Sequence, residues 1–198
     1  SPASSIYGAN AYSGVINIIT KTPGQLRGTT VRFNYGENDT VIGSILHAGE
    51  LPDGKLKYKI SAEYDQTRGW QYPLEKNAEV FRFNALAEYS LGEKGRLVLS
   101  AGRGHSKNRK FLSSTLIGSG LLDYKNDYLQ VEAEYGHFKF STFYKNETPI
   151  IVWDLGRERQ AWNISTINVE LLHSFNWNQK HSLVWGIDYR YNIMEKNP

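Results

Sequence analysis

Long stretches of this chain alternate apolar and polar residues one by one, and this period of two constrains the fold more than any other feature. In LKYKISAEYD, residues 56–65, the even positions are aliphatic or tyrosine, whereas the odd positions are lysine, serine or acidic. Successive side chains of a β-strand point to opposite faces, so such a segment forms a ribbon with one apolar and one polar face. The pattern recurs in EVFRFNALAEYS (79–90), LQVEAEYG (129–136) and LVWGIDYRYN (183–192).

The alternation and the turn residues between the segments predict about nine strands. They lie near residues 28–36, 40–48, 55–66, 78–91, 96–105, 125–136, 137–146, 162–175 and 180–192. Tight turns such as LPDGK and LGEKG alternate with longer connections near 67–77, 106–124 and 147–161, apart from a brief GEND between the first two strands. Short turns at one end and long loops at the other are typical of outer-membrane barrels.

We therefore predict an all-β fold: part of an antiparallel up-and-down transmembrane β-barrel, with roughly nine strands of a larger barrel. A register slip of one residue would turn the charged face of 56–65 into the hydrocarbon, which costs on the order of 10 kcal/mol at most. A soluble antiparallel sheet with one buried and one solvated face also alternates. Strands of ten or more residues and apolar faces that end in tyrosine or tryptophan favour the membrane interpretation.

Composition excludes several other classes of protein. No apolar run approaches the roughly 20 residues of a spanning helix, and the absence of cysteine excludes disulfides and thiolate metal sites. The net charge is only +3, and the basic residues are interspersed with acidic ones. They form no basic stripe of the kind that nucleic-acid-binding proteins carry. The histidines are scattered and enzyme motifs are missing, so we predict a protein that is not an enzyme, with no catalytic residue, no metal site and no cofactor.

The segment YGANAYSGVINIITKTP, residues 7–23, closely resembles the end of the plug domain of TonB-dependent outer-membrane receptors. The resemblance implies that residues 1–24 complete a plug domain and that residues 25–198 form the N-terminal portion of an outer-membrane β-barrel. Small residues in this segment let backbones approach closely. We expect structural roles in the plug for Tyr7, Gly8, Gly14 and Asn17.

The resemblance also implies a function, a location and partners. It implies active transport of a scarce nutrient (a ferric siderophore, haem or a cobalamin-like chelate), energised through the TonB complex, in the outer membrane of a Gram-negative bacterium. The partners would be the metal chelate or similar nutrient, the TonB energy-coupling complex, lipopolysaccharide and the outer membrane. By this resemblance most of the plug and the contact region for TonB lie upstream, and family barrels have about 22 strands.

Ligand binding is expected in the long loops, because rigid scaffolds carry variable function on their loops. Aromatic and arginine side chains suit a bulky, often anionic chelate through stacking and charge-assisted hydrogen bonds. The candidates are Arg68, Trp70, Tyr72, Trp153, Arg157 and Arg159. The same residues could instead form an aromatic girdle and meet lipopolysaccharide phosphates. Two other functions stay open: a passive porin, and a soluble β-sandwich binding or adhesion module.

Overall fold

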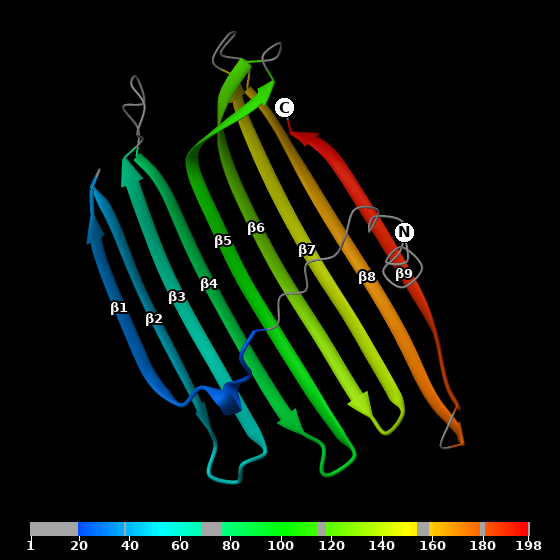
Figure 1. Cartoon of the computed structure of the whole chain (residues 1–198). Helices are drawn as coiled ribbons and strands as arrows, with labels where there is room; N and C mark the ends of the chain where they lie inside the picture. Colours follow the sequence, from blue (N-terminus) through cyan, green and yellow to red (C-terminus); the bar gives the residue numbers. More distant parts are fainter. Residues whose placement is uncertain are drawn as a thin grey trace.

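The computed structural model of the chain shows one antiparallel sheet (Figure 1). It describes residues 20–37, 39–68, 77–114, 118–153, 159–178 and 181–197, in which nine strands and one short 3-10 helix occur. They are η1 (Pro23–Gln25), β1 (Gly28–Gly36), β2 (Thr40–Glu50), β3 (Leu56–Arg68), β4 (Asn77–Ser90), β5 (Gly95–Ser114), β6 (Gly118–Tyr135), β7 (Phe138–Trp153), β8 (Arg159–Asn178) and β9 (His181–Asn197). Each strand pairs with the next along the chain, so the predicted all-β, up-and-down arrangement of nine strands is confirmed.

The sheet is open in the part of the chain that the structure describes. There, β1 pairs only with β2 and β9 only with β8, and the two edge strands lie on opposite sides of the sheet (Figure 1). Closure into a barrel therefore stays a prediction, as does the plug, whose predicted residues 1–19 lie outside the described ranges. Among the described residues, none belongs to a helix long and apolar enough to cross a membrane.

Tight turns gather at one end of the sheet, at the bottom of Figure 1. Residues 51–55 join β2 to β3, 91–94 join β4 to β5, and 136–137 join β6 to β7. Each of these turns contains a glycine at positive φ, a backbone conformation that other residues rarely adopt: Gly54 at 67°, Gly92 at 84° and Gly136 at 59°. Strands β1, β3, β5 and β7 end at the opposite end of the sheet.

Two of the predicted long connections are wrong in extent, because strands occupy most of them. We expected connections at 106–124 and 147–161, but β5, β6, β7 and β8 continue through most of both segments. The backbone groups there find partners across the neighbouring strand, as in the pairs Lys110 with Leu121 and Ile150 with Ala161. Buried or paired backbone groups need such partners, and pairing outweighs the turn-like composition that suggested loops.

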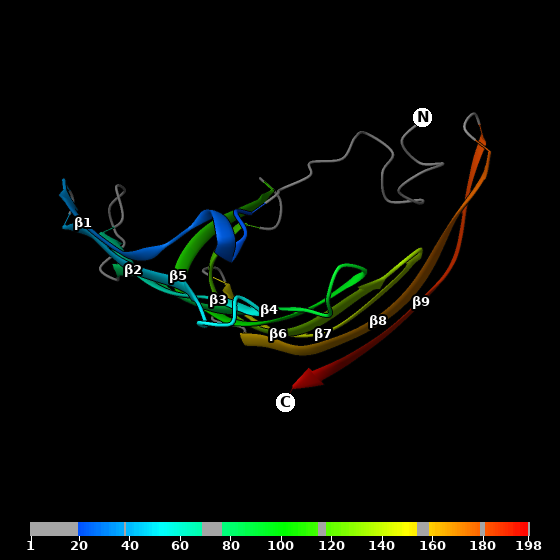
Figure 2. The ribbon, with the colours of Figure 1, turned by 90° about the horizontal axis from the view of Figure 1, so that it is seen from below.

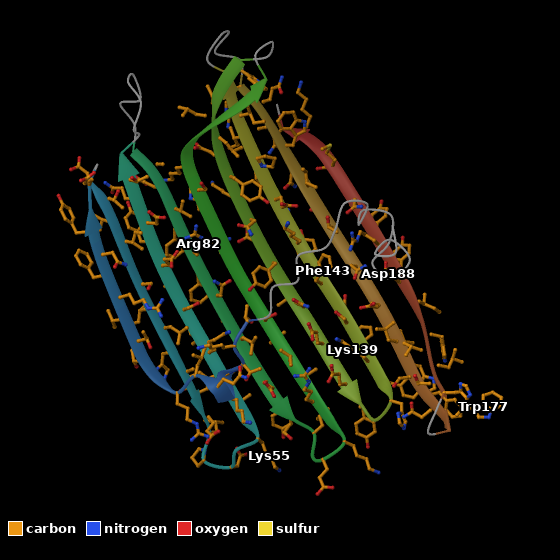
Figure 3. The ribbon with its side chains drawn as sticks, in the orientation of Figure 1. Lys55, Arg82, Lys139, Phe143, Trp177 and Asp188 are labelled. Carbon is orange, nitrogen blue, oxygen red and sulfur yellow. The ribbon has the colours of Figure 1, made fainter. Side chains whose placement is uncertain are left out.

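The sheet curves into a trough with a concave and a convex face (Figure 2). Alternate residues of each strand share a face, so the cross-strand register assigns every described strand residue to one of the two. One row runs from Glu63 through Arg82, Gly104 and Asn126 to Glu147, and this polar row belongs to the concave face. Figure 3 shows the polar side chains of this face toward the reader, among them those of Arg82, Lys139 and Asp188. The predicted separation of apolar and polar faces is confirmed.

Almost no apolar side chain is buried in the described part of the chain. The buried apolar side chains there are Ala48, Ala161 and Pro23, whereas Phe33 is 71% exposed and Ile187 is 65% exposed. The exposed large apolar residues lie mostly on the convex face. A single layer cannot cover its own apolar face, and soluble monomers rarely expose patches of more than a few hundred Å². The convex face therefore requires an apolar environment or a partner.

The segment 20–27 lies on the concave side of the sheet, against β2, β3 and β4 (Figure 2). Its η1 turn is closed at the start by two hydrogen bonds: the Thr22 N–H donates to Gln25 Oε1 at 3.0 Å, and the Gln25 N–H donates to the Thr22 carbonyl at 3.1 Å. At its end, Arg27 forms an ion pair with Glu50 of β2 at 2.9 Å. The buried ring of Pro23 anchors the segment between these polar contacts.

Candidate functional site

The predicted ligand-binding loop residues that the structure describes lie at the end of the sheet opposite the tight turns. Arg68 ends β3, Trp153 ends β7 and Arg159 begins β8. The side chain of Arg68 lies outside the described residues, as do three further predicted residues: Trp70, Tyr72 and Arg157. The predicted plug residues lie outside them too: Tyr7, Gly8, Gly14 and Asn17.

Of the predicted loop residues that the structure describes, Arg68, Trp153 and Arg159 do not gather into one site. β3 and β7 are four strands apart, so the backbones of Arg68 and Trp153 are separated by roughly 19 Å along the sheet. Trp153 and Arg159 are close in register, but Arg159 pairs with Val152, the residue before Trp153. Consecutive residues point to opposite faces, so Trp153 belongs to the concave face and Arg159 to the convex face.

The concave face carries a layer of paired charges instead. Arg96 of β5 donates two hydrogen bonds to the carboxylate of Glu134 on β6, from Nε at 2.8 Å and from Nη2 at 3.1 Å. Lys139 of β7 approaches the same carboxylate at 3.8 Å, and Arg82 of β4 pairs with Glu63 of β3. Bidentate arginine–carboxylate pairs are among the stronger ion pairs in proteins. Cross-strand pairs of this kind fix the strand register from the polar side.

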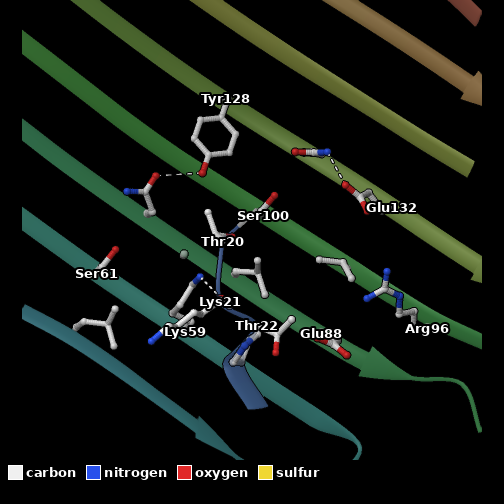
Figure 4. A pocket seen from close by; sticks show the side chains of 17 residues that line it. Thr20, Lys21, Thr22, Lys59, Ser61, Glu88, Arg96, Ser100, Tyr128 and Glu132 are labelled. Atoms are coloured by element: carbon white, nitrogen blue, oxygen red, sulfur yellow. Dashed lines mark hydrogen bonds between the residues drawn. The ribbon is translucent and has the colours of Figure 1, made fainter. Parts of the chain in front are cut away.

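A hollow of about 610 Å³ lies on the concave face between the segment 20–27 and strands β2 to β6 (Figure 4). Its roof is held by a hydrogen bond from Lys59 Nζ to the Lys21 carbonyl at 2.8 Å. Its walls combine apolar residues, among them Leu46, Leu86 and Val98, with charged, amide and hydroxyl groups. The polar residues are Lys59, Ser61, Asn84, Glu88, Arg96, Ser100, Tyr128, Gln130 and Glu132. Such walls can hold water or a polar ligand through many weak, distributed contacts, because donors and acceptors are both present.

Tyr128 spans two strands at the edge of this hollow. Its hydroxyl donates a hydrogen bond to Asn84 Oδ1 of β4 at 3.1 Å. To reach β4 from β6, the ring of Tyr128 lies over the intervening strand β5 at Gly102. A side chain at Gly102 would collide with this ring, since a Cβ there would lie 2.4 Å from Tyr128 Cε1. The absence of a side chain at Gly102 thus makes room for a phenol that links β4 to β6.

Nearer the end of the sheet opposite the tight turns, a second group of polar side chains joins β6 to β7. The hydroxyl of Tyr124 donates to Glu147, and Lys145 pairs with the same carboxylate at 2.8 Å. Burial, together with the hydrogen bond to Glu147, raises the pKa of Tyr124 to about 12. Burial opposes ionisation of Glu147, but the hydrogen bonds from Lys145 and Tyr124 outweigh it and lower the pKa of Glu147. At neutral pH the phenol is therefore a neutral donor and the carboxylate a charged acceptor.

Among the described residues, no group of three or more histidine or acidic side chains is arranged to hold a metal ion. Glu132 and Glu134 of β6 both accept hydrogen bonds from neighbouring side chains. Glu134 accepts from Arg96, and Glu132 accepts from Gln130 Nε2 at 2.7 Å. The donors and acceptors of this face can bind polar groups through hydrogen bonds and charge.

The concave groups that sequence reasoning missed are Tyr124, Asn126 and Tyr128. They continue the alternating polar face of LQVEAEYG toward the N-terminus, so the period of two could have found them. Tyr124 fell inside a segment predicted to be a connection. What the pattern could not supply was their partners, since Asn84 is 44 residues from Tyr128.

Comparison of the chain with protein-family models and with curated proteins finds no match.

Proposed function

We propose that this sheet is a membrane-spanning wall of an outer-membrane transport receptor of the TonB-dependent kind. One observation carries the proposal: the sheet is apolar on its convex face and charged on its concave face, with almost no buried apolar side chains in its described part. A soluble protein places these faces the other way round, whereas a membrane barrel turns its apolar face to lipid.

The dimensions of the convex apolar band agree with this proposal. On β3 the band runs from Leu56 to Tyr64, which is about 27 Å along the strand and about 20 Å along the membrane normal at a typical tilt. Aromatic residues border the band on both sides, as the girdles of membrane barrels do. Those near the tight turns are Tyr58, Tyr89, Tyr135, Phe138 and Phe175, and those near the other end are Tyr35, Tyr64, Phe81, Tyr144 and Tyr191.

An ion pair lies at the end of the apolar band that is remote from the tight turns. Arg103 of β5 and Asp127 of β6 form an ion pair on the convex face at 2.6 Å, next to the apolar residues Ala101 and Leu129. Tyr124 and Glu147 lie beyond this level, outside the proposed membrane span. Charged side chains at the bilayer midplane cost about 2–4 kcal/mol each but little at the interface, so this position is consistent with the membrane boundary.

The transport role rests on the resemblance of residues 7–23 to the end of a plug domain and on the polar concave face. The ligand is a scarce nutrient such as a ferric siderophore, haem or a cobalamin-like chelate. Its import draws on the TonB complex, and binding and gated passage take the place of catalysis. The paired charges of the concave face, together with the polar residues among those that line the hollow beneath the segment 20–27, supply polar contacts for such a passage.

The membrane orientation is tested by labels on the two faces. The chain contains no cysteine, so single cysteines at Ile60 and at Ser61 can each carry an environment-sensitive fluorophore in lipid vesicles. Brominated acyl chains should quench the label at Ile60 and leave that at Ser61 bright. A soluble β-sandwich predicts no quenching at either position, and that result would sink the proposal.

The transport role is tested in cells. Deletion of the gene should abolish uptake of one of the three nutrient classes, and the lost uptake should depend on the proton-motive force. A passive porin predicts uptake that continues when an uncoupler collapses that force. Growth on ferric siderophore, haem or cobalamin as the limiting nutrient identifies the class.

A further inference from the structure

One row of the convex face lacks a side chain where its neighbours are aromatic. Phe33, Gly43, Tyr64 and Phe81 lie in register across β1, β2, β3 and β4. Three of these positions carry rings, and the fourth is glycine. A Cβ built at Gly43 would meet nothing within 4 Å, so the position is open space and not a tight packing point. The row therefore has a gap one residue wide.

The gap opens into an apolar groove of about 330 Å³. Phe33 on one side and Tyr64 with Phe81 on the other form its walls, and these three rings are 71%, 40% and 41% exposed. Its floor continues along the strands to Val31, Ile45 and Ala62, which form the next convex row toward the tight turns. The flanking strands β1 and β3 are two strand spacings apart, about 9.6 Å, which leaves room for one extended hydrocarbon chain between the rings.

We propose that this groove binds one acyl chain of a bilayer lipid. The inference rests on the proposed membrane location of the convex face. The groove is continuous with the apolar band and crosses the aromatic row at its border, where a lipid chain leaves its headgroup. A peptide would bring N–H and C=O groups that this almost wholly apolar lining cannot satisfy, whereas a hydrocarbon chain brings none.

Photo-crosslinking tests the proposal with the full native chain in phosphatidylcholine vesicles. The probe is a phosphatidylcholine that carries a diazirine on one acyl chain, and peptide mass spectrometry counts adducts along the convex face. Gly43→Leu places an apolar side chain in the groove, and its Cβ would meet nothing within 4 Å. Ala87→Leu is the matched control, because Ala87 is a convex residue of β4 that pairs with Tyr58 and Leu99, outside the groove.

We expect adducts on the groove residues to exceed those on the rest of the convex face, and to fall severalfold in Gly43→Leu but not in Ala87→Leu. Adducts spread evenly over the convex face, or unchanged by Gly43→Leu, would overturn the groove and leave the membrane location intact. Absence of adducts from the whole convex face would overturn both the groove and the proposed membrane location.

Discussion

Gly102 shows how a missing side chain can hold strands together. The ring of Tyr128 crosses β5 at this residue to reach Asn84, and an alanine Cβ would lie 2.4 Å from the ring and 2.9 Å from the Phe83 carbonyl. We expect Gly102→Ala to lower the free energy of unfolding by about 1–3 kcal/mol, because overpacking forces the ring or the backbone to move. Urea unfolding in lipid vesicles measures the effect.

Gly43→Ala is the matched control for this prediction. Both substitutions add the same methyl group to a strand interior, but the Cβ at Gly43 meets nothing within 4 Å. Equal unfolding free energies for the two alanine variants would show that the phenol does not depend on Gly102.

The phenol of Tyr124 gives a prediction about pH. Its pKa in the folded protein is raised to about 12 from the ordinary value of 10.0, first by burial and then by the hydrogen bond to Glu147. The neutral phenol is thus favoured in the folded state. Its contribution to stability is complete below pH 10 and is lost as pH rises toward 12, because the unfolded chain ionises first.

The absorbance titration of the wild type minus that of Tyr124→Phe isolates this phenol. Its midpoint should lie near pH 12. Glu147→Gln should move the midpoint toward the ordinary range, since the charged acceptor is gone. A difference titration with an ordinary tyrosine midpoint in the wild type would contradict the assigned environment.

At the scale of elements, the segment 20–27 is held to the concave face by few contacts. Lys59 donates to the Lys21 carbonyl, Arg27 pairs with Glu50, and the ring of Pro23 is buried. We expect Lys59→Met to loosen the segment, so that trypsin cleaves after Lys21 severalfold faster than in the wild type. The timed appearance of the cleaved fragment on gels or by mass spectrometry measures this rate.

Lys145→Met serves as the control for the docked segment, since Lys145 also lies on the concave face but pairs with Glu147, far from η1. It removes a trypsin site and a positive charge without touching the segment. If both variants are cleaved after Lys21 at the wild-type rate, the hydrogen bond from Lys59 does not hold the segment down.

At the scale of the whole molecule, the two faces should differ in how well they tolerate the same added charge. Leu99 and Ser100 are neighbours on β5 that point to the convex and the concave face. Leu99→Arg should lower the free energy of unfolding in vesicles by about 2–4 kcal/mol, because it places a guanidinium in hydrocarbon. Ser100→Arg should change it little. Equal losses for the two variants would contradict the assignment of faces.

The sequence predicts which residues of a strand share its apolar or polar face, but it does not predict which residues of other strands they contact. In residues 56–65 the alternation is complete, so the apolar side of β3 follows from local pattern alone. The strand ends near Ser114 and Trp153 were missed, because pairing with the adjacent strand decides them and local composition does not. The contact of Tyr128 with Asn84 depends on the register of three strands, which the period of two leaves undetermined.

The order of the strands also bears on how fast the sheet can form. Every described strand pairs with its neighbour in sequence, so each ladder closes only a short stretch of chain. The entropy lost on closing a loop grows with its length, and native contacts that are local in sequence speed folding. Folding of the sheet can therefore begin at any hairpin of two adjacent strands, and the remaining strands can then pair one at a time with either edge of that hairpin.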